Sequence, residues 1–361
     1  MNDILYWVWL AEAIGPCSPS LVSLLREFTY IEDIYENRNT SAAGMNLKPT
    51  EFKRMRSTTL ERAQSIIDAA ANCGARIITY NDDAYPARLR ATHFPPTVLY
   101  VTGSAKALDT DCVAGVGARG STRYGREAAQ RICTGLAQSG LTLVSGLAHG
   151  IDAEVHRAAL ASGAPTVAVL GTAIDDTYPR DHKNLRGEIE AAGGVVVSEY
   201  PPGTRWNRGM FPMRNRIISG LSRAVIVFEA AKKSGTMITA NWALDDGREV
   251  FAVPGSIFAE TSEGTNRLIK QGAYPATSAA DVLSVLGIDE PARQKPQPDE
   301  TPEITGEGKK ILAAVRDCEL TLDEIADKAG IMPMDLLAEL TELEMDGRIT
   351  VLPGPKYTSA R

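Results

Sequence analysis

The sequence predicts an α/β protein built around a Rossmann-like, doubly wound and mostly parallel sheet. A small N-terminal helical (SAM-like) domain and a C-terminal winged-helix domain are expected on either side of it. Between Ala75 and Leu286, short runs rich in β-branched residues alternate with amphipathic segments. Strands without polar alternation, separated by helices, indicate parallel strands covered on both faces. After Leu286 come a stretch rich in proline and charge, several short helical segments and a Gly-Pro hairpin.

Residues 1–75 form the predicted helical domain. The segments 21–28 and 60–74 carry apolar residues at helical spacing, and Gly74 ends the second. The segment 14–20, IGPCSPS, occupies the place of the glycine-rich turn of a helix-hairpin-helix element. Because it has a single glycine, a packing role is favoured over contact with DNA.

Residues 76–288 form the predicted Rossmann-like domain, which carries the candidate site. In such an open sheet the ligand binds beyond the carboxyl ends of the strands. The expected strands are residues 112–117, 141–146, 165–171, 194–199, 224–230 and 248–255.

Residues 289–305 and 306–361 form the predicted linker and the predicted winged-helix domain. The linker is assigned from its proline and charge content. The expected recognition helix of the winged domain lies within residues 337–348, which carry four acids against one arginine. Reading of duplex DNA by this helix is therefore not favoured, and a protein contact or dimer-level regulation is preferred.

Composition excludes several classes of protein. The chain has 361 residues, 44% hydrophobic and 23% charged, which is an ordinary globular balance. Because it lacks a run of about eighteen apolar residues, and has an acid where a signal peptide needs basic residues, we expect a cytoplasmic protein with no membrane partner. Its five cysteines are scattered and form no CxxC, which predicts reduced thiols without a metal site.

Positive charge is concentrated in the middle of the chain, although the formal net charge is −7. Residues 201–228 contain five arginines and no acid or lysine, and residues 112–126 contain three arginines and no acid. Residues 291–361, by contrast, hold fourteen acids against nine basic residues. Because the local field sets the affinity for a polyanion, the middle of the chain can attract phosphates.

Residues 115–120, GVGARG, form a GxGxxG pattern after an expected strand. A dinucleotide site needs an acid at the end of the next strand to hold the ribose, whereas that strand ends in Ser145-Gly146. The loop also carries Arg119. We therefore expect no NAD and no other cofactor, and interpret the loop as one that brings backbone N–H groups and Arg119 close to a phosphate.

Two further segments add positive charge to the same edge of the expected sheet. Residues 234–236 open a helix directly after Lys233, and the first N–H groups of a helix carry positive partial charge. A simple N-cap role in this segment is the alternative. Arg180 and Lys183 follow another expected strand.

The segment FPMRNR, residues 211–216, places two arginines at the edge of an apolar stretch. Arg214 and Arg216 are expected at the strand ends, where they require an anion. Asn215 can bond a phosphate or a base edge, and Phe211 offers a ring for stacking of a base, which is worth about 1–3 kcal/mol. The expected anion is a nucleic-acid backbone, and an open, flat rim suits a single strand better than a duplex.

Other roles are possible for these charged residues. One of the two arginines could be buried and paired with Glu199 or Glu229. His149 and His156 lie near Asp152 in the sequence, but Asp152 is expected to be an N-cap, and the histidines lack cysteine or acid partners at metal spacing. Since the sequence also lacks a nucleophile elbow, a Walker lysine and paired carboxylates, we expect a protein that is not an enzyme and holds no metal.

Long motifs follow one another through residues 77–285: VAGVGAR, VSGLAHGIDAEVHRAAL, AVLGTAIDDTYPRDHKNL, SEYPPGT, FPMRNRIISGLS, VFEAAKKSGTMITA, REVFAVPGSI and GTNRLIKQGA. In sequence and spacing they resemble the DNA-processing protein family DprA, also called Smf. The resemblance implies a cytoplasmic, non-catalytic protein that binds single-stranded DNA taken up in natural transformation. It further implies that the protein shields this strand, loads the recombinase RecA onto it, and forms a homodimer through the Rossmann domain.

The residues and the resemblance together give one set of expected contacts. The family usually has Gly-Ser-Arg where this chain has Gly117-Ala118-Arg119, so one phosphate hydrogen bond is lost or passes to the backbone. The alternative functions are a nucleotide-binding or nucleotide-hydrolysing Rossmann enzyme of the phosphoribohydrolase-like group and a nucleotide-sensing defence protein. The expected DNA-binding residues are Gly117, Ala118, Arg119, Ser145, Gly146, Arg180, Lys183, Phe211, Arg214, Asn215, Arg216, Lys233, Ser234, Gly235 and Thr236.

Overall fold

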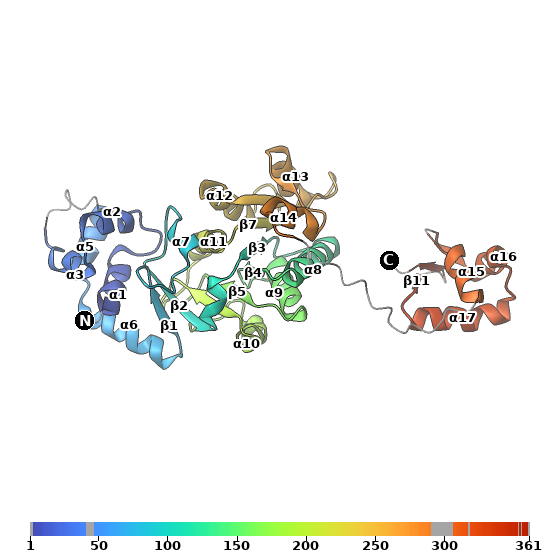
Figure 1. Ribbon diagram of the computed structural model, residues 1–361, viewed down its shortest axis with the longest axis horizontal. Helices are drawn as coiled ribbons and strands as arrows, with labels where there is room; N and C mark the ends of the chain where they lie inside the picture. Colours follow the sequence, from blue (N-terminus) through green and yellow to red (C-terminus); the bar gives the residue numbers. More distant parts are fainter. Residues whose placement is uncertain are drawn as a thin grey trace. The chain divides into compact units, whose positions relative to one another are not determined.

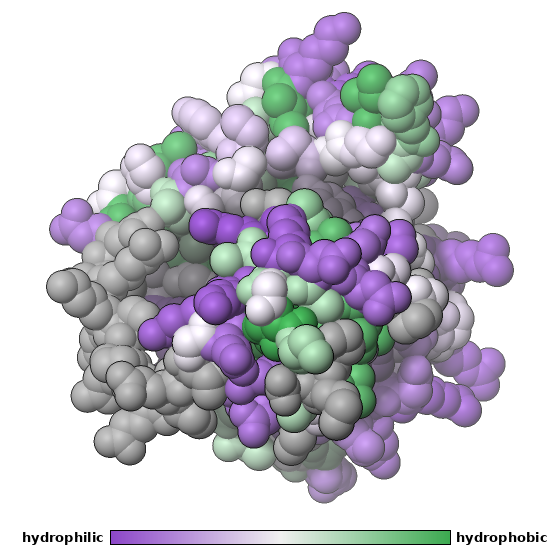
Figure 2. Space-filling view, turned by 90° about the vertical axis from the view of Figure 1, so that its right-hand side faces the viewer, coloured by the Kyte–Doolittle hydropathy of each residue, from purple (hydrophilic) through white to green (hydrophobic). Residues whose placement is uncertain are grey.

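The computed structural model describes residues 3–40, 47–289, 306–316, 318–352, 354 and 356–359. The chain divides into two compact units, Met1–Pro291 and Ala292–Arg361 (Figure 1). Apart from Asp289, the predicted linker lies outside the described residues. None of the described helices is both long enough and apolar enough to cross a membrane. Hydrophilic residues cover much of the face drawn in Figure 2, with hydrophobic patches between them.

A nine-stranded sheet organises the first unit, in the order β1-β2-β6-β5-β4-β3-β7-β8-β9. All neighbours from β6 to β9 pair in parallel, whereas β2 is antiparallel to both β1 and β6. The mostly parallel sheet and the predicted strands are therefore confirmed. The strands are β1 (Arg76–Thr79), β2 (Val98–Gly103), β3 (Cys112–Val116), β4 (Thr142–Ser145), β5 (Thr166–Val169), β6 (Val195–Ser198), β7 (Ala224–Val227), β8 (Glu249–Ala252) and β9 (Tyr274–Pro275).

The strand order reverses at β3. From β3 the chain proceeds outward through β4, β5 and β6, then returns to place β7 on the other side of β3. Ala114 of β3 is in register with Val144 of β4 and with Val225 of β7, so these strands end at nearly the same level. In open α/β sheets, such a reversal leaves a crevice at the carboxyl ends of the strands, where ligands bind.

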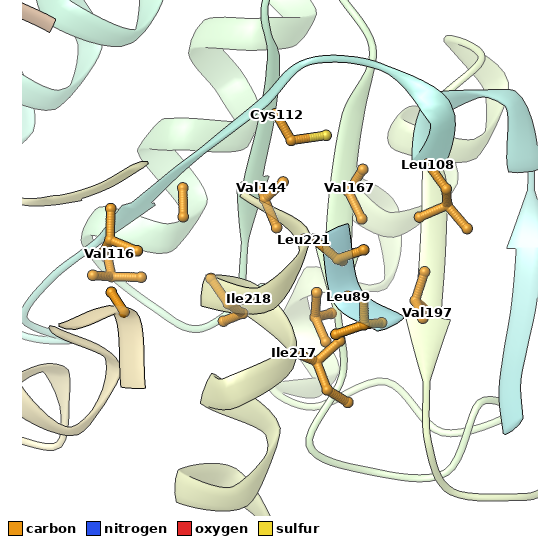
Figure 3. Packing of buried hydrophobic residues seen from close by; sticks show 14 of the residues in the cluster. Leu89, Leu108, Cys112, Val116, Val144, Val167, Val197, Ile217, Ile218 and Leu221 are labelled. Atoms are coloured by element: carbon orange, nitrogen blue, oxygen red, sulfur yellow. The ribbon is translucent and has the colours of Figure 1, made fainter. Parts of the chain in front are cut away.

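Both faces of the sheet are buried, because the strands carry apolar residues at successive positions. Val116 and Val144 lie on one face, against Ile217 and Ile218 (Figure 3). Val113, whose side chain alternates with that of Val116, lies in the core of the other face. The covering helices are α7 (Ala87–Arg90), α11 (Met210–Leu221), α12 (Thr236–Asp245) and α13 (Glu263–Lys270) on the first face, and α8 (Arg123–Gln138), α9 (Ile151–Ala161), α10 (Lys183–Ala191) and α14 (Ala279–Leu286) on the second.

The N-terminal helices share a core with this sheet. Trp7 and Trp9 are buried in the same cluster as Val98 and Tyr100 of β2. The predicted helices at 21–28 and 60–74 are confirmed, and the predicted boundary at 75/76 remains a prediction. The helices are α1 (Asp3–Ile14), α2 (Ser20–Glu27), α3 (Ile31–Glu36), α5 (Pro49–Ser57) and α6 (Leu60–Asn72).

The second unit has the expected helices and hairpin. Ile311, Ile325, Leu340 and Ile349 form its core. A three-stranded sheet has the order β10-β12-β11, with antiparallel pairing throughout. The elements are α15 (Gly306–Ala314), β10 (Leu320–Thr321), α16 (Leu322–Ala329), α17 (Pro333–Met345), β11 (Ile349–Leu352) and β12 (Lys356–Ser359).

Candidate nucleic-acid interface

A cavity of about 610 Å³ lies where the strand order reverses. Its walls come from the loop after β3, the start of α9, the first half of α11 and the start of α12. The structure thus brings together segments that lie far apart in the sequence. Predicted residues that line this cavity are Gly117, Ala118, Arg119, Phe211, Arg214, Asn215, Ser234, Gly235 and Thr236.

Glycines let the loop after β3 lie directly on α9. A Cβ atom at Gly117 would lie 2.5 Å from the Ile151 side chain, and one at Gly150 would lie 2.3 Å from the Ala118 carbonyl oxygen. Gly150 also has φ +74°, a conformation that favours glycine. The glycine pattern therefore serves helix–loop packing, and it holds Arg119 exposed at the mouth of the cavity.

Arg214 provides a buried positive charge deep in the cavity. Its guanidinium donates hydrogen bonds to the carbonyl oxygens of Gly146, at 2.7 Å, and of Val169. Burial lowers the pKa of Arg214 to about 10, against the opposing effect of the Asp152 carboxylate, so the group is still charged at neutral pH. A Cβ atom at Gly146 would lie 2.5 Å from this guanidinium, which explains the glycine at that position.

Asp152 has a role different from the one expected. The N-cap residue of α9 is Gly150, and Asp152 lies in the first turn, where its carboxylate accepts the N–H of Ala148 at 3.4 Å. Burial raises the pKa of Asp152, whereas the Arg214 charge opposes this shift. The predicted N-cap role is therefore wrong, because this carboxylate faces Arg214 from the wall of the cavity.

The prediction for Arg216 is also wrong. Both arginines lie on α11 rather than at strand ends, and positions two apart on a helix differ by about 200°. Arg216 therefore points away from the cavity, is 2% exposed, and forms an ion pair with Glu199. The alternative of a buried arginine paired with Glu199 is confirmed for this residue. Glu229 has another role, since its carboxylate accepts the N–H and the hydroxyl of Thr122 before α8.

The prediction for Ser145 is a third correction. It is fully buried, and its hydroxyl donates to the Gly115 carbonyl oxygen at 2.7 Å. Because its side chain is fully buried and does not line the cavity, it is not accessible to a strand of DNA. Arg180, Lys183 and Lys233 are exposed and lie outside the cavity lining as the described residues define it, so their contacts stay predictions.

An aromatic cluster beside the arginines joins the predicted Phe211 to two rings that were not predicted, Tyr178 and Trp206. The ring centroids of Tyr178, Trp206 and Phe211 are 5.0, 5.3 and 5.7 Å apart, and the Arg119 guanidinium lies 5.5 Å from the centroid of Phe211. Trp206 is 42% exposed and Tyr178 is 36% exposed, so both rings are accessible. Arg208 also lines the cavity and was not among the expected contacts. Trp206 and Arg208 could have been predicted from the sequence, because both lie within the acid-free segment 201–228.

The start of α12 forms the opposite wall. The N-cap residue is Gly235, and the Ser234 hydroxyl accepts the N–H of Thr236 at 3.2 Å and donates to its hydroxyl at 3.0 Å. The Asn215 amide donates to the Gly235 carbonyl oxygen at 3.4 Å. The N-cap alternative is therefore wrong in its residue, because the N-cap is Gly235, although Ser234 still bonds the first helical residue. The positive end of the helix dipole faces the cavity.

The charges around the cavity favour an anion. Among the described residues that line it, the formally charged side chains are three arginines, Arg119, Arg208 and Arg214, and one acid, Asp152. Two of these arginines, Arg119 and Arg208, are exposed. Arg119 also lines a smaller recess, together with His149 and the rings of Tyr178 and Phe211. The arrangement can bind a phosphate and stack a planar base in the same place.

Comparison with known proteins identifies the family. The family described as DNA recombination-mediator protein A matches residues 76–287, and the DprA winged helix domain matches residues 293–355. Protein Smf of Escherichia coli is 39% identical over 287 residues, which cover 77% of this chain and 76% of that protein. The putative DNA processing protein DprA of Mycobacterium tuberculosis is 34% identical over 357 residues, covering 94% and 90%.

Solved structures agree with this result. DNA processing protein A of Streptococcus pneumoniae superposes with a TM-score of 0.65 at 33% identity, covering 76% of this chain and 95% of that one. DNA processing protein A of Helicobacter pylori, whose structure was described as giving insights into its unique single-stranded DNA binding mode, superposes with a TM-score of 0.54 at 30% identity, covering 61% and 99%. The predicted resemblance is confirmed, and the chain belongs to the DprA (Smf) family of DNA-processing proteins.

Proposed function

We propose that this chain binds single-stranded DNA in the cavity at the carboxyl ends of β3 and β7. The observation that carries the proposal is the mixed lining, in which three arginines and three aromatic rings surround one space. The description of the Helicobacter pylori relative as a binder of single-stranded DNA supports it.

The two kinds of side chain have different tasks. Arg119 and Arg208 are exposed and can donate charge-assisted hydrogen bonds to phosphate oxygens, each worth about 1.5–3 kcal/mol. Trp206 and Tyr178 can stack on bases at about 1–3 kcal/mol per base, without selecting a sequence. Since the bases of a duplex are stacked on each other and closed to such rings, this lining favours a single strand over a duplex.

We also propose the partners that the family resemblance implies. A second copy of the chain binds through the Rossmann domain, and RecA receives the strand, as part of natural transformation. The family description as a recombination mediator supports this assignment. The winged helix contacts a protein, since Glu342, Glu344 and Asp346 of α17 and its C-terminus are exposed acids.

The chain acts in this proposal by binding, without turnover. The acid in the cavity lining, Asp152, faces Arg214 and accepts the Ala148 N–H, which leaves it poorly placed to activate water. The family match does not favour the alternative of a nucleotide-hydrolysing enzyme.

Fluorescence anisotropy with a labelled oligonucleotide, single-stranded and duplex in parallel, tests the proposal. Arg119→Ala is expected to weaken single-strand binding about 10–100-fold and to reduce the salt slope by about 0.7. The matched control is Arg123→Ala, which removes a nearby exposed arginine that pairs with Glu127. Equal losses in the two variants, or wild-type binding by Arg119→Ala, would contradict the proposal.

A further inference from the structure

Two loops at the edge of the cavity bring together a group of side chains that the sequence keeps apart. His149 precedes α9, whereas Asp181 and His182 lie in the 3₁₀ turn Arg180–His182. The ligand atoms of the three residues all lie within 4.8 Å of one another, with His149 Nε2 and Asp181 Oδ1 at 3.7 Å. Within the described ranges, this is the one group of three or more His, Cys, Asp or Glu side chains close enough to hold a metal ion.

His182 has the environment of an oriented metal ligand. It is 7% exposed, and its Nδ1 lies 2.9 Å from the carbonyl oxygen of Leu147. A carbonyl oxygen can only accept, so this contact assigns the proton of the neutral imidazole to Nδ1 and leaves the lone pair on Nε2. A backbone carbonyl that fixes the tautomer in this way is the usual partner of a metal-binding histidine.

The other two side chains are free to close on an ion. The side chain of His149 is 52% exposed and that of Asp181 is 68% exposed, so rotation of either one meets little packing. The ring centroids of His149 and His182 are 4.8 Å apart and the rings are inclined by 72°, so the two imidazoles lie side by side at this edge. Since the ligand atoms already lie within 4.8 Å of one another, rotation of the two exposed side chains moves them toward the distances of about 2.0–2.2 Å that zinc ligands have.

We propose that His149, Asp181 and His182 form a binding site for a divalent transition metal ion of the zinc class. Two imidazoles with one carboxylate suit Zn²⁺ or Co²⁺, whereas Mg²⁺ and Ca²⁺ prefer oxygen ligands alone. Three protein ligands leave a fourth position open. The exposed neighbours Arg180 and Lys183 add positive charge, so the affinity is expected to be lower than that of a closed structural zinc site.

The sequence predicts no metal site here, because the candidate partners of His149 that lie near it in the chain are His156 and Asp152. His156 is fully buried and bonds Thr166 through Nδ1 at 2.8 Å, so it is no ligand. The partner of His149 comes from a loop about thirty residues further along, and only the packing of α10 beside α9 brings that loop close.

Titration of the full, tag-free chain with Zn²⁺ against a chromophoric chelator tests the site. Wild type is expected to bind one Zn²⁺ ion. His149→Ala and Asp181→Asn should each lower the affinity for this ion at least about tenfold, because removal of even an outer-shell partner of a metal ligand costs that much. The matched control is His93→Ala, because His93 is also exposed and paired with one carboxylate, Asp246, at 2.8 Å. This variant should bind like wild type.

A Co²⁺ titration separates this site from the exposed thiols of Cys73 and Cys318. The Co²⁺ complex of the protein should show visible d–d bands without a thiolate-to-cobalt charge-transfer band. It should form equally well in the Cys73→Ser, Cys318→Ser double variant. The variants replace the exposed ligands His149 and Asp181, because replacement of the buried His182 could disturb the fold and so lose the metal for another reason. The proposal is overturned if wild type binds no Zn²⁺, if His149→Ala binds it unchanged, or if the thiol double variant loses the site.

Discussion

Replacement of Arg216 is the perturbation whose outcome the structure defines best. Arg216 is 2% exposed, its partner Glu199 is 8% exposed in its side chain, and the two form an ion pair inside the first unit. Glu199 Oε2 and Arg216 Nε and Nη1 are buried without a hydrogen-bond partner among the described residues. The hydrogen bonds of the pair therefore do not offset the full cost of removing both charges from water. Each buried charge is stabilised mainly by the opposite charge of its partner.

Arg216→Met should lower the free energy of unfolding by about 3–5 kcal/mol, because it leaves the Glu199 charge buried and unpaired. The double variant Glu199→Leu, Arg216→Met removes both charges and should recover most of this loss, or exceed wild type by about 1–4 kcal/mol. Arg123→Met, which breaks the exposed pair with Glu127, should cost at most about 1 kcal/mol.

Urea unfolding followed by tryptophan fluorescence measures these changes, since all four tryptophans, Trp7, Trp9, Trp206 and Trp242, lie in the first unit. The folded double variant should also bind single-stranded DNA like wild type. A cost below about 1 kcal/mol for Arg216→Met would refute the buried pair. Weakened DNA binding by the stable double variant would show that Arg216 contacts the strand after all.

Three further outcomes follow from the cavity and its surroundings. Gly146→Ala places a Cβ atom 2.5 Å from the Arg214 guanidinium, so it should cost about 1–3 kcal/mol in thermal unfolding and weaken strand binding; an unchanged melting temperature would contradict the close contact. Burial lowers the pKa of His156 to about 3, so the unfolded chain binds the extra proton as the pH falls through 6.5, and the free energy of unfolding should fall by about 1.6 kcal/mol between pH 6.5 and 5. His156→Gln should remove that part of the slope in urea titrations at the two pH values. Trp206→Ala should weaken binding of a single strand by about 1–3 kcal/mol in anisotropy, whereas Trp206→Phe retains most of it; equal losses would exclude stacking.

The sheet and the place of the candidate site could be predicted from the sequence. Apolar runs such as those of β3 and β7 identify strands buried on both faces, and the reversal of strand order fixes the crevice at their carboxyl ends. The loop carrying Arg119 and the start of α12 follow these strands directly, so their place at the cavity follows from the fold class.

The directions of the side chains could not be predicted in the same way. Arg214 and Arg216 look equivalent in the sequence, and only the phase of α11 against the sheet turns one into the cavity and the other toward Glu199. Ser145 ends its strand with its hydroxyl donating to the Gly115 carbonyl oxygen of β3, a contact between strands that is not visible in the sequence around either residue. The Asp152 carboxylate interacts electrostatically with Arg214, which lies about sixty residues further along the chain, so local helix-capping rules could not predict its role.

Contacts between distant loops account for the rest. Tyr178 and Trp206 meet Phe211 because the chain after β5 and the chain after β6 come together at the same edge of the sheet. The N-terminal helices share their core with β1 and β2, although composition alone indicates a separate domain. Both sets of contacts join segments that are distant in the sequence, so no pattern within either segment predicts them.

Photo-crosslinking of a single strand that carries 5-iodouracil tests the central claim most directly. Bases stacked in the cavity should crosslink to Tyr178, Trp206 or Phe211, and peptides from residues 171–216 should carry the label. The yield should fall in Arg119→Ala and stay unchanged in Arg123→Ala. Crosslinks confined to the winged helix, or spread evenly over the first unit, would contradict binding in this cavity.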